Sequence, residues 1–387
     1  MWYFTEEQNQ LQKTCRQFAK EELAPFAEKF DETESFNIKA FKKLGELGLL
    51  GITADPEYGG AGLGSLEATI VMEELGRACA STTLSYLAHT ILCVNNIDKN
   101  ASNEQKQKYL PKLITGEHIG CMGMSEPENG SDAVGMKTRA KKESNGTYSI
   151  TGNKMWITNA QFSDVVYLYT RTGEAKKDLT TFIVEKNTPG FSVSKEIHKM
   201  GMRASPTGEL SFEKCNVPAS QRVGLDGDSV KHMMKNLDLE RVTISGISLG
   251  IAQACLDQCV KYAHERKQFG KSIGNFQLIQ KMIAEMSTET AMMRHFLYSA
   301  CKQFDLNENS PSAAKDNTLA AQVKLALPKM ATKIALDAIQ LHGGYGYSRE
   351  FPLERYMRDA KLMEIGAGTN EVMIMIIAKN LLKDCLE

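Results

Sequence analysis

Glu240 is the side chain in this sequence whose position best suits acid–base chemistry. It stands in the stretch Leu237–Arg241, at the start of a run with the three- and four-residue apolar spacing of an amphipathic helix. The apolar positions of that run are Leu237, Ile244, Ile247, Ile251 and Cys255. A carboxylate on the apolar face of a helix is costly to desolvate, so it is either paired with a cation or given a raised pKa that suits proton transfer. The residue types leave both interpretations open, and Arg241 or Lys235 would be the partner in an ion pair.

Two stretches before Glu240 have residue types that suit an anionic or heteroaromatic ligand. Residues 122–132 combine turn-forming residues with the hydroxyls of Ser125 and Ser131. Such a loop can present backbone N–H groups and hydroxyls to a ligand, although a plain loop at the start of a β domain would have a similar composition. Residues 156–159 follow, and Trp156 either packs in the core or lies against a flat cofactor.

Two stretches after Glu240 also have residue types that suit ligand binding. Arg266–Gly270 and Gln277 supply hydrogen-bond donors, and the guanidinium fork of Arg266 suits a pyrophosphate. A solvated, charged helix end would carry the same residues. Residues 366–371 form a small-residue loop before a helix, in which Thr369 also suits an ordinary N-cap.

Several other patterns argue against particular functions. Residues 246–250 match the GxSxG nucleophile elbow of serine hydrolases, but they fall inside the helical run, where small residues allow a neighbouring helix to approach. The 7 histidines show no metal-binding spacing and the 9 cysteines form no CxxC pair, so no metal site is expected. A net charge of -1 gives no electrostatic footprint for nucleic acid.

The 387 residues are enough for two or three domains. Helical patterns fill the first part of the chain, strand-like runs separated by turn residues follow, and helical periodicity then returns and lasts to the end. We therefore expect a mainly α protein with a β middle. Its domains would be an N-terminal helical domain (1–117), a central antiparallel β domain (118–226) and a C-terminal four-helix bundle (227–387).

The N-terminal part gives further local predictions. Thr5 and Gln8 form a capping-box pattern at the start of the first helix, and Asn103 is expected to cap a later one. The first residues have the features of neither a signal peptide nor a transit peptide, and no run of apolar residues is long enough to predict a membrane span. Scattered thiols fit a reducing compartment.

Taken in order, these stretches resemble the acyl-CoA dehydrogenases, and the resemblance covers essentially the whole chain. The matching stretches are Ser125-Glu126-Pro127, Gly130-Ser131-Asp132, Trp156-Ile157-Thr158, Arg266–Gly270, Gln340–Gly346 and Gly368-Thr369. The resemblance implies the same α–β–α order of domains, FAD as cofactor and a homotetramer. It also implies oxidation of the Cα–Cβ bond of an acyl-CoA thioester, with electrons passed to an electron-transfer flavoprotein. Such an enzyme would be cytoplasmic in a bacterium, or in the mitochondrial matrix of a eukaryote after removal of a transit peptide.

The family resemblance also assigns the catalytic base. Many members carry a glutamate just before the terminal Gly-Thr, where this chain has Ala367, whose side chain cannot act as a base. A minority carry it on the first long helix of the C-terminal domain, where Glu240 stands. Residues 237–241 and 364–369 look most like the subgroup that converts isovaleryl-CoA to 3-methylcrotonyl-CoA in leucine catabolism. Lys231 departs from that subgroup, some of whose members carry a tyrosine there.

The same resemblance assigns the remaining site residues. FAD would be held by Met122, Met124, Ser125, Gly130, Ser131, Trp156, Ile157, Thr158, Arg266, Phe269, Gln277, Gln340, Gly343, Gly344, Thr369 and Glu371. Among these, Arg266, Gln277 and the Gln340–Gly344 turn would reach the FAD of a neighbouring subunit. The acyl-CoA would lie against Ser131, Asp238, Leu239, Arg241, Gly366, Ala367 and Gly368. The backbone N–H of Ala367 would face the thioester oxygen, and the small Gly366 and Ala367 would leave room for a branched chain.

Three alternatives remain open. The substrate can be a medium or long straight-chain acyl-CoA of fatty-acid β-oxidation, which a chain-length series of thioesters would reveal. The protein can be a flavoprotein of this fold that reacts with oxygen, which would consume O₂ without a partner flavoprotein. It can also be a non-enzymatic relative that uses the fold as a binding module and has no yellow cofactor.

Overall fold

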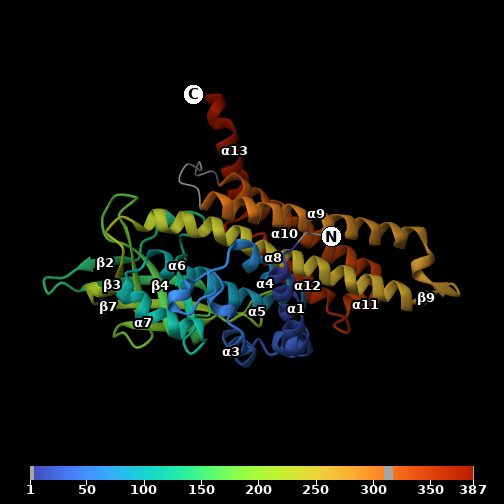
Figure 1. Cartoon of the computed structure of the whole chain (residues 1–387), viewed down its shortest axis with the longest axis horizontal. Coiled ribbons are helices and arrows are strands. Elements are labelled where there is room, and N and C mark those ends of the chain that lie inside the picture. Colours follow the sequence, from blue (N-terminus) through green and yellow to red (C-terminus); the bar gives the residue numbers. More distant parts are fainter. Residues whose placement is uncertain (1–3, 309–316, 387) are drawn as a thin grey trace.

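The computed structural model describes residues 4–308 and 317–386. Helices occupy the chain as far as Ile114, strands follow from Gly120 to Val223, and helices return at Ser229 (Figure 1). This helix–strand–helix order agrees with the expected fold class. We propose that the domain boundaries lie in the two links between these segments, near residues 117 and 226.

The first segment is a set of short helices. They are α1 (Glu6–Phe18), α2 (Ala27–Glu32), α3 (Ile38–Glu46), α4 (Ser65–Ala78), α5 (Ala80–Leu87), α6 (Asn95–Asn100) and α7 (Asn103–Ile114), with π-helical turns at Ala19–Leu23 and Ala88–Val94. The capping box predicted at the start of α1 is confirmed, because Thr5 and Gln8 exchange hydrogen bonds of 3.0 and 3.2 Å. The prediction for Asn103 is wrong by one residue. Ser102 is the N-cap of α7, and its hydroxyl accepts a hydrogen bond of 3.3 Å from the N–H of Gln105.

The middle segment is a twisted sheet. Its strands are β1 (Gly120–Gly123), β2 (Arg139–Lys142), β3 (Tyr148–Thr158), β4 (Val165–Arg171), β5 (Leu179–Glu185), β6 (Phe191–Glu196), β7 (Thr207–Val217) and β8 (Arg222–Val223). Their order is β6-β7-β3-β2-β4-β5-β8, and β1 pairs with β4 off this path. Most pairs are antiparallel, as expected, but β1 and β2 both pair parallel to β4. Parallel pairing joins segments that are distant along the chain, so local sequence patterns do not indicate it.

Strand β4 shows how the sheet is buried. Every residue of this strand is buried, because alternate side chains pack on opposite faces. Val165, Tyr167 and Tyr169 belong to a core shared with the N-terminal helices and the start of the next long helix. Val166 and Leu168 belong to a second core among the strands. Burial on both faces explains why this segment is a continuous apolar run rather than an alternating one.

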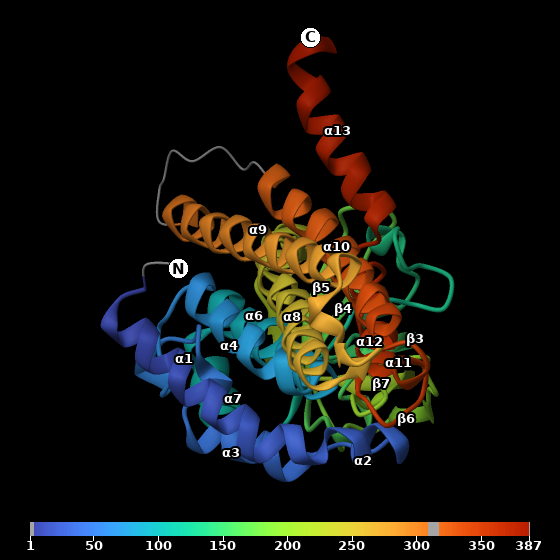
Figure 2. The ribbon, with the colours of Figure 1, turned by 90° about the vertical axis from the view of Figure 1, so that its right-hand side faces the viewer.

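The last segment contains the long helices. They are α8 (Ser229–Glu265), α9 (Gln277–Glu308), α10 (Thr318–His342), α11 (Gly344–Tyr347), α12 (Leu353–Met363) and α13 (Asn370–Leu386). Helix α8 crosses the molecule from the sheet to a small hairpin of β9 (Lys267–Gln268) and β10 (Lys271–Ser272) (Figure 1). Helix α13 projects away from the rest of the chain (Figure 2). Among its described side chains, large exposed apolar ones are Ile374, Met375, Leu381 and Leu382.

The GxSxG stretch of α8 is a helix-packing surface. A Cβ at Gly250 would lie 2.5 Å from the carbonyl oxygen of Glu73 on α4, and a Cβ at Gly246 would lie 2.9 Å from the Cβ of Met72. Neither distance is compatible with a side chain, so the glycines allow α4 and α8 to approach closely. Ser248 is fully buried. A serine in a buried, regular helix cannot act as an exposed nucleophile, which excludes the hydrolase interpretation.

Candidate active site

Glu240 lies where two hydrophobic cores meet. Leu237, one turn before it on α8, belongs to the core shared with the sheet, whereas Ile244, one turn after it, belongs to the core of the helical segments. The side chain of Glu240 is buried. Burial raises its pKa to about 7, against the opposing effect of the positive charges of Arg241 and Lys324. A carboxyl group with this pKa is able to take up and release a proton near neutral pH.

The ion-pair interpretation of Glu240 is not what the structure shows. Arg241 pairs instead with Asp238, with 2.7 Å between Nη1 and Oδ1. Lys235 is exposed. Within residues 4–308 and 317–386, no hydrogen bond or ion pair reaches the Glu240 carboxyl group. The buried carboxyl group is therefore left free for a reacting partner.

The loop between α12 and α13 lies beside Arg241. A Cβ at Gly368 would be 3.9 Å from Nη2 of Arg241, so the loop and the residue after Glu240 are close neighbours. Ala367 has a φ of 57° and Gly368 a φ of 95°, so two successive residues take the left-handed conformation. Of the described residues, none accepts a hydrogen bond from the Ala367 N–H. The structure thus brings the predicted substrate residues 238–241 and 366–368 together.

Thr369 and Glu371 are at the start of α13, next to the same loop. The hydroxyl of Thr369 accepts a hydrogen bond of 3.3 Å from the N–H of Val372, so Thr369 does act as a cap. Glu364 fixes the other side of the loop by accepting a hydrogen bond of 2.7 Å from the hydroxyl of Thr332. The predicted FAD residues at the start of α13 therefore belong to the group of residues around Glu240.

The stretches around Ser125 and Trp156 are also brought together. The carbonyl oxygen of Ser125 accepts a hydrogen bond of 2.9 Å from the N–H of Met155. Trp156 lies in an irregularity of β3 between Lys154 and Ile157, with a φ of 65°, and 56% of its side chain is exposed. The core-packing interpretation of Trp156 is therefore wrong, and its indole is free to lie against a flat molecule. Ile157 is buried in the strand core, so only its backbone can take part in binding.

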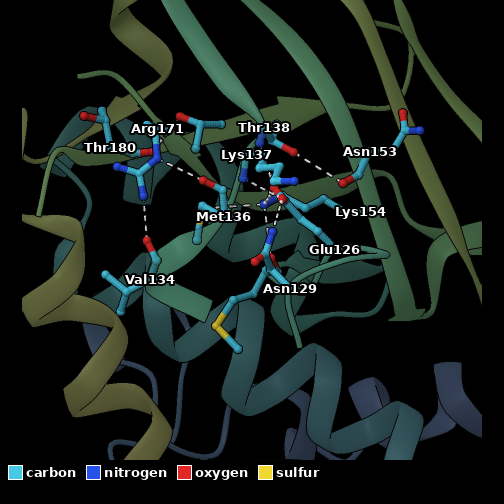
Figure 3. Close-up of polar contacts among 12 residues, drawn as sticks. Glu126, Asn129, Val134, Met136, Lys137, Thr138, Asn153, Lys154, Arg171 and Thr180 are labelled. Carbon is cyan, nitrogen blue, oxygen red and sulfur yellow. Dashed lines mark hydrogen bonds and ion pairs between the residues drawn. The ribbon is translucent and has the colours of Figure 1, made fainter. Parts of the chain in front are cut away.

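A buried ion pair holds the 122–138 loop in place (Figure 3). Lys154 on β3 donates to Oε1 of Glu126 at 2.9 Å and to the carbonyl oxygen of Met124 at 3.0 Å. Glu126 also accepts hydrogen bonds from the N–H groups of Lys137, at 2.6 Å, and Thr138, at 2.8 Å. Burial alone would raise the pKa of Glu126, but the charge of Lys154 and these hydrogen bonds lower it to about 2. The carboxylate is thus charged at neutral pH and anchors both ends of the loop.

Arg171 completes this support. Its guanidinium donates to the carbonyl oxygens of Met136 at 2.9 Å and Val134 at 2.6 Å (Figure 3). It also donates to the carbonyl oxygen of Ala175 at 2.8 Å. Two of these bonds, to Val134 and Met136, fix the chain that follows the exposed Gly130–Asp132 turn, and the third joins it to the loop between β4 and β5. The sequence reasoning missed both Lys154 and Arg171, because a charged residue within a strand pattern reads as surface until the pairing of the strands is known.

The remaining predicted site residues lie in a separate group at the far end of α8. The guanidinium carbon of Arg266 is 5.4 Å from the centre of the Tyr345 ring, which joins the β9–β10 hairpin to the turn after α10. The other members of this group are exposed: Phe269, Gln277, Gln340, Gly343 and Gly344. Arg266 follows Glu240 by 26 residues, which is about 39 Å along a helix. The predicted site residues of one chain therefore fall into two separated groups, and we propose that these are two half-sites rather than a single site.

Metal and membrane features are both lacking in the described part of the chain. No group of three or more histidine, cysteine, aspartate or glutamate side chains could hold a metal ion there. None of the helices that were placed is both long enough and apolar enough to cross a membrane.

Comparison with known proteins gives matches along the chain. The models of the acyl-CoA dehydrogenase N-terminal, middle and C-terminal domains match residues 5–117, 121–215 and 228–382. The mitochondrial isovaleryl-CoA dehydrogenase of Pongo abelii is 48% identical over 97% of this chain and 88% of that protein. The enzyme of the same name from Solanum tuberosum is 46% identical, over 98% of this chain and 92% of that protein.

A solved structure is similar over the whole chain. Butyryl-CoA dehydrogenase from Megasphaera elsdenii has a TM-score of 0.94 and 34% sequence identity, and the match covers 99% of this chain and 100% of that one. The arrangement of helices and sheet described above is therefore shared with a solved acyl-CoA dehydrogenase.

Proposed function

This chain belongs to the acyl-CoA dehydrogenase family, an FAD-dependent family of enzymes, and we propose that it oxidises isovaleryl-CoA to 3-methylcrotonyl-CoA with Glu240 as the base. The observation that carries the proposal is the buried Glu240, which has no ion-pair partner among the described residues and lies beside a loop whose Ala367 has no acidic side chain. The 48% identity to a protein named isovaleryl-CoA dehydrogenase supports the choice of substrate.

The residues present fit FAD. Trp156 is a large, exposed aromatic side chain on a backbone in the left-handed conformation. It lies beside a polar loop that is held in place by the hydrogen bonds of Glu126. This combination of a flat apolar surface and outward polar groups suits an isoalloxazine ring. The 122–131 loop and residues 156–158 would hold that ring. When bound, FAD supplies an acceptor for the hydride that leaves Cβ.

The chain's own residues account for removal of the α-proton. The α-proton of a thioester is too weak an acid to leave unaided, so the developing charge on the thioester oxygen needs donors. We assign the backbone N–H of Ala367, which has no acceptor among the described residues, to that oxygen. One such donor is worth roughly 3–4 kcal/mol. The Glu240 carboxylate takes the proton, and burial keeps water away from it.

The pH dependence of the reaction follows from the state of Glu240. Its pKa in the folded protein is raised to about 7, and only the carboxylate form can accept a proton. We expect kcat/KM for isovaleryl-CoA to rise with pH through about 7 and then level off. Steady-state kinetics across the pH range tests this. An acid limb near the ordinary glutamate value of about 4 would show that a solvent-exposed carboxylate is the base instead.

Gly366 offers a test of the preference for a branched chain. A Cβ added there would meet only the carbonyl oxygen of Leu362, at 3.6 Å, so the backbone tolerates a side chain. A larger residue would instead fill the space proposed for the branched carbons. We expect Gly366→Leu to lower kcat/KM for isovaleryl-CoA about 10–200-fold and to affect butyryl-CoA less. Gly366→Ala is the smaller control, and equal turnover of isovaleryl-CoA by Gly366→Leu and wild type would contradict the assignment.

One experiment tests the proposed function as a whole. Purified protein is titrated anaerobically with isovaleryl-CoA, octanoyl-CoA and palmitoyl-CoA while the visible flavin band is followed. Bleaching by isovaleryl-CoA at the lowest concentration supports the proposal. Bleaching first by a longer thioester would assign the protein to straight-chain oxidation, rapid reoxidation by O₂ would assign it to the oxygen-reactive flavoproteins, and absence of a flavin band would leave a binding module.

The separation of the two half-sites supports an assembly of several copies. Because Arg266 is about 39 Å from Glu240, both cannot hold the same flavin from one chain. Helix α13 projects from the rest of the chain (Figure 2). The exposed apolar side chains of Ile374 and Leu381 on it suit contact with another subunit. We therefore propose a homotetramer in which Arg266 of one subunit completes the FAD site of another. An electron-transfer flavoprotein would receive the electrons, and mitochondrial and bacterial relatives support a matrix or cytoplasmic location.

A further inference from the structure

We infer that Lys324 is a positioning residue of this active site, which fixes the 364–369 loop behind the thioester and supplies a buried positive charge to Glu240. Lys324 is on α10, a different element from both Glu240 and the loop. The inference rests on the proposed role of Glu240, and the experiment below separates the two.

The contacts of Lys324 join the two ends of the loop. Its side chain is fully buried, and Nζ donates to the carbonyl oxygen of Met363 at 2.6 Å and to that of Gly368 at 3.2 Å. Met363 is the last residue of α12, and Gly368 lies just before α13. One ammonium group therefore sets the distance between the two helix ends that the loop connects. Carbonyl oxygens at a helix C-terminus have no partner within the helix, so the bond to Met363 satisfies one of the last acceptors of α12.

The conformation of the loop depends on such an anchor. Ala367 is in the left-handed region, which a residue with a Cβ adopts only when its surroundings impose it. Lys324 holds Gly368, the residue after Ala367, by a hydrogen bond to its carbonyl oxygen. The start of the loop is held by the hydrogen bond from Thr332 to Glu364. The direction of the Ala367 N–H, which is assigned to the thioester oxygen, is set by this backbone. Loss of the Lys324 ammonium would release the loop at Gly368.

Lys324 also lies close enough to Glu240 for its charge to act on the carboxyl group. Its ammonium group holds the carbonyl oxygen of Gly368, and a Cβ at Gly368 would be 3.9 Å from Nη2 of Arg241, the residue after Glu240. The charged or titratable groups that face Glu240 are Arg241 from α8, Lys324 from α10 and the phenol of Tyr169 from β4. Arg241 already pairs with Asp238. Among the residues that the structure describes, none offers a carboxylate within hydrogen-bond distance of Lys324, whose bonds go to two carbonyl oxygens. Glu364 is the other acidic group whose charge reaches Lys324. Removal of the Lys324 charge should therefore make the Glu240 carboxylate harder to form, and less of the base would be present at neutral pH.

The test compares pH profiles of the holoenzyme with isovaleryl-CoA. For Lys324→Met we expect the acid limb of kcat/KM to move up by about one pH unit, which lowers kcat/KM about fivefold at pH 7 and about tenfold well below that pH. We also expect kcat to fall at pH values above the acid limb, where Glu240 is ionised, with little change in KM. The reason is that the Ala367 N–H acts mainly in the transition state. Lys324→Arg keeps the charge and should retain the acid limb. Lys333→Met is the matched control on the same helix, since Lys333 is exposed and pairs with Glu289 and Asp337.

The outcomes are distinct. A folded Lys324→Met enzyme with the wild-type acid limb and kcat overturns the inference. If Lys324→Met does not bind flavin, Lys324→Gln, which keeps a donor but not the charge, decides in the same way. If both Lys324→Met and Lys324→Gln lower kcat but leave the acid limb unmoved, the inferred effect of the Lys324 charge on Glu240 is also overturned. Full activity of Glu240→Gln, in contrast, would refute the proposed function itself, whatever the Lys324 variants do.

Discussion

Replacement of Glu240 by glutamine is expected to lower kcat/KM for isovaleryl-CoA by about 10²–10⁴-fold, the usual contribution of a general base. Glutamine has nearly the same shape, so the buried position stays filled and FAD should remain bound. The carboxylate that accepts the α-proton is absent, and Ala367 cannot replace it. Anaerobic titration with isovaleryl-CoA, followed by the visible flavin band, should show bleaching in wild type and none in Glu240→Gln.

The same variant should be more stable than wild type at alkaline pH. The pKa of Glu240 is about 7 in the folded chain and about 4 in an unfolded one. Between these values the folded protein binds a proton that the unfolded chain has lost, so wild-type stability falls as the pH rises through this window. Glutamine has no such proton. Glu240→Gln should therefore match wild type near pH 4 and exceed it at pH 8 by a few kcal/mol.

Two results would contradict this account of Glu240. Bleaching of the variant as fast as wild type would place the base elsewhere. A variant that is less stable than wild type at pH 8 would mean that Glu240 is a structural partner, because removal of a paired buried charge destabilises. Glu174→Gln serves as a control for loss of a surface carboxylate, since the exposed Glu174 pairs with the exposed Arg139, and it should change neither activity nor stability by a large amount.

The sequence was informative where the physics is local. Apolar spacing located α8 and set Glu240 on its buried face, because the side chains of a helix repeat every three or four residues. The capping box at Thr5 was predictable for the same reason. At α7, Ser102 and Asn103 are both good caps, and only the fit of the hydroxyl to the N–H of Gln105 selects Ser102.

The support of the site was not predictable, because it depends on residues that are distant along the chain. Lys324 reaches Met363 and Gly368 only after α10 and α12 have packed together. The exposure of Trp156 is decided by an irregularity in the pairing of β3 with β7, and a one-residue shift in a strand reverses which face a side chain takes. The separation of the two half-sites likewise follows from the unbroken length of α8. Family resemblance suggested what each site residue does, but the contacts that hold these residues in position are tertiary.

The largest stability effect is expected at Lys154, under the flavin loop. Lys154 is fully buried and Glu126 almost so. Their ion pair is held by the N–H groups of Lys137 and Thr138. Lys154→Met would leave the carboxylate buried without its cation, which costs about 3–5 kcal/mol. The loop that carries Ser125 would loosen with it, since Lys154 also holds the carbonyl oxygen of Met124. We expect a lower thermal midpoint and release of FAD at lower temperature, measured by flavin fluorescence during melting.

The double variant Lys154→Met/Glu126→Gln separates a charge effect from a packing effect. If the uncompensated carboxylate is the cause, removal of its charge should restore a large part of the lost stability, and the two substitutions should be strongly non-additive.

Acid pH should have the same effect on Lys154→Met alone. Without Lys154 the pKa of Glu126 rises, so protonation relieves the single variant as the pH falls, while wild type, whose Glu126 has a pKa of about 2, gains nothing. Lys137→Met is the control in the same loop, because Lys137 pairs with Glu128 at the surface and such pairs contribute about 0–1 kcal/mol. A double variant less stable than Lys154→Met would show that the pair acts through shape and hydrogen bonds rather than through charge.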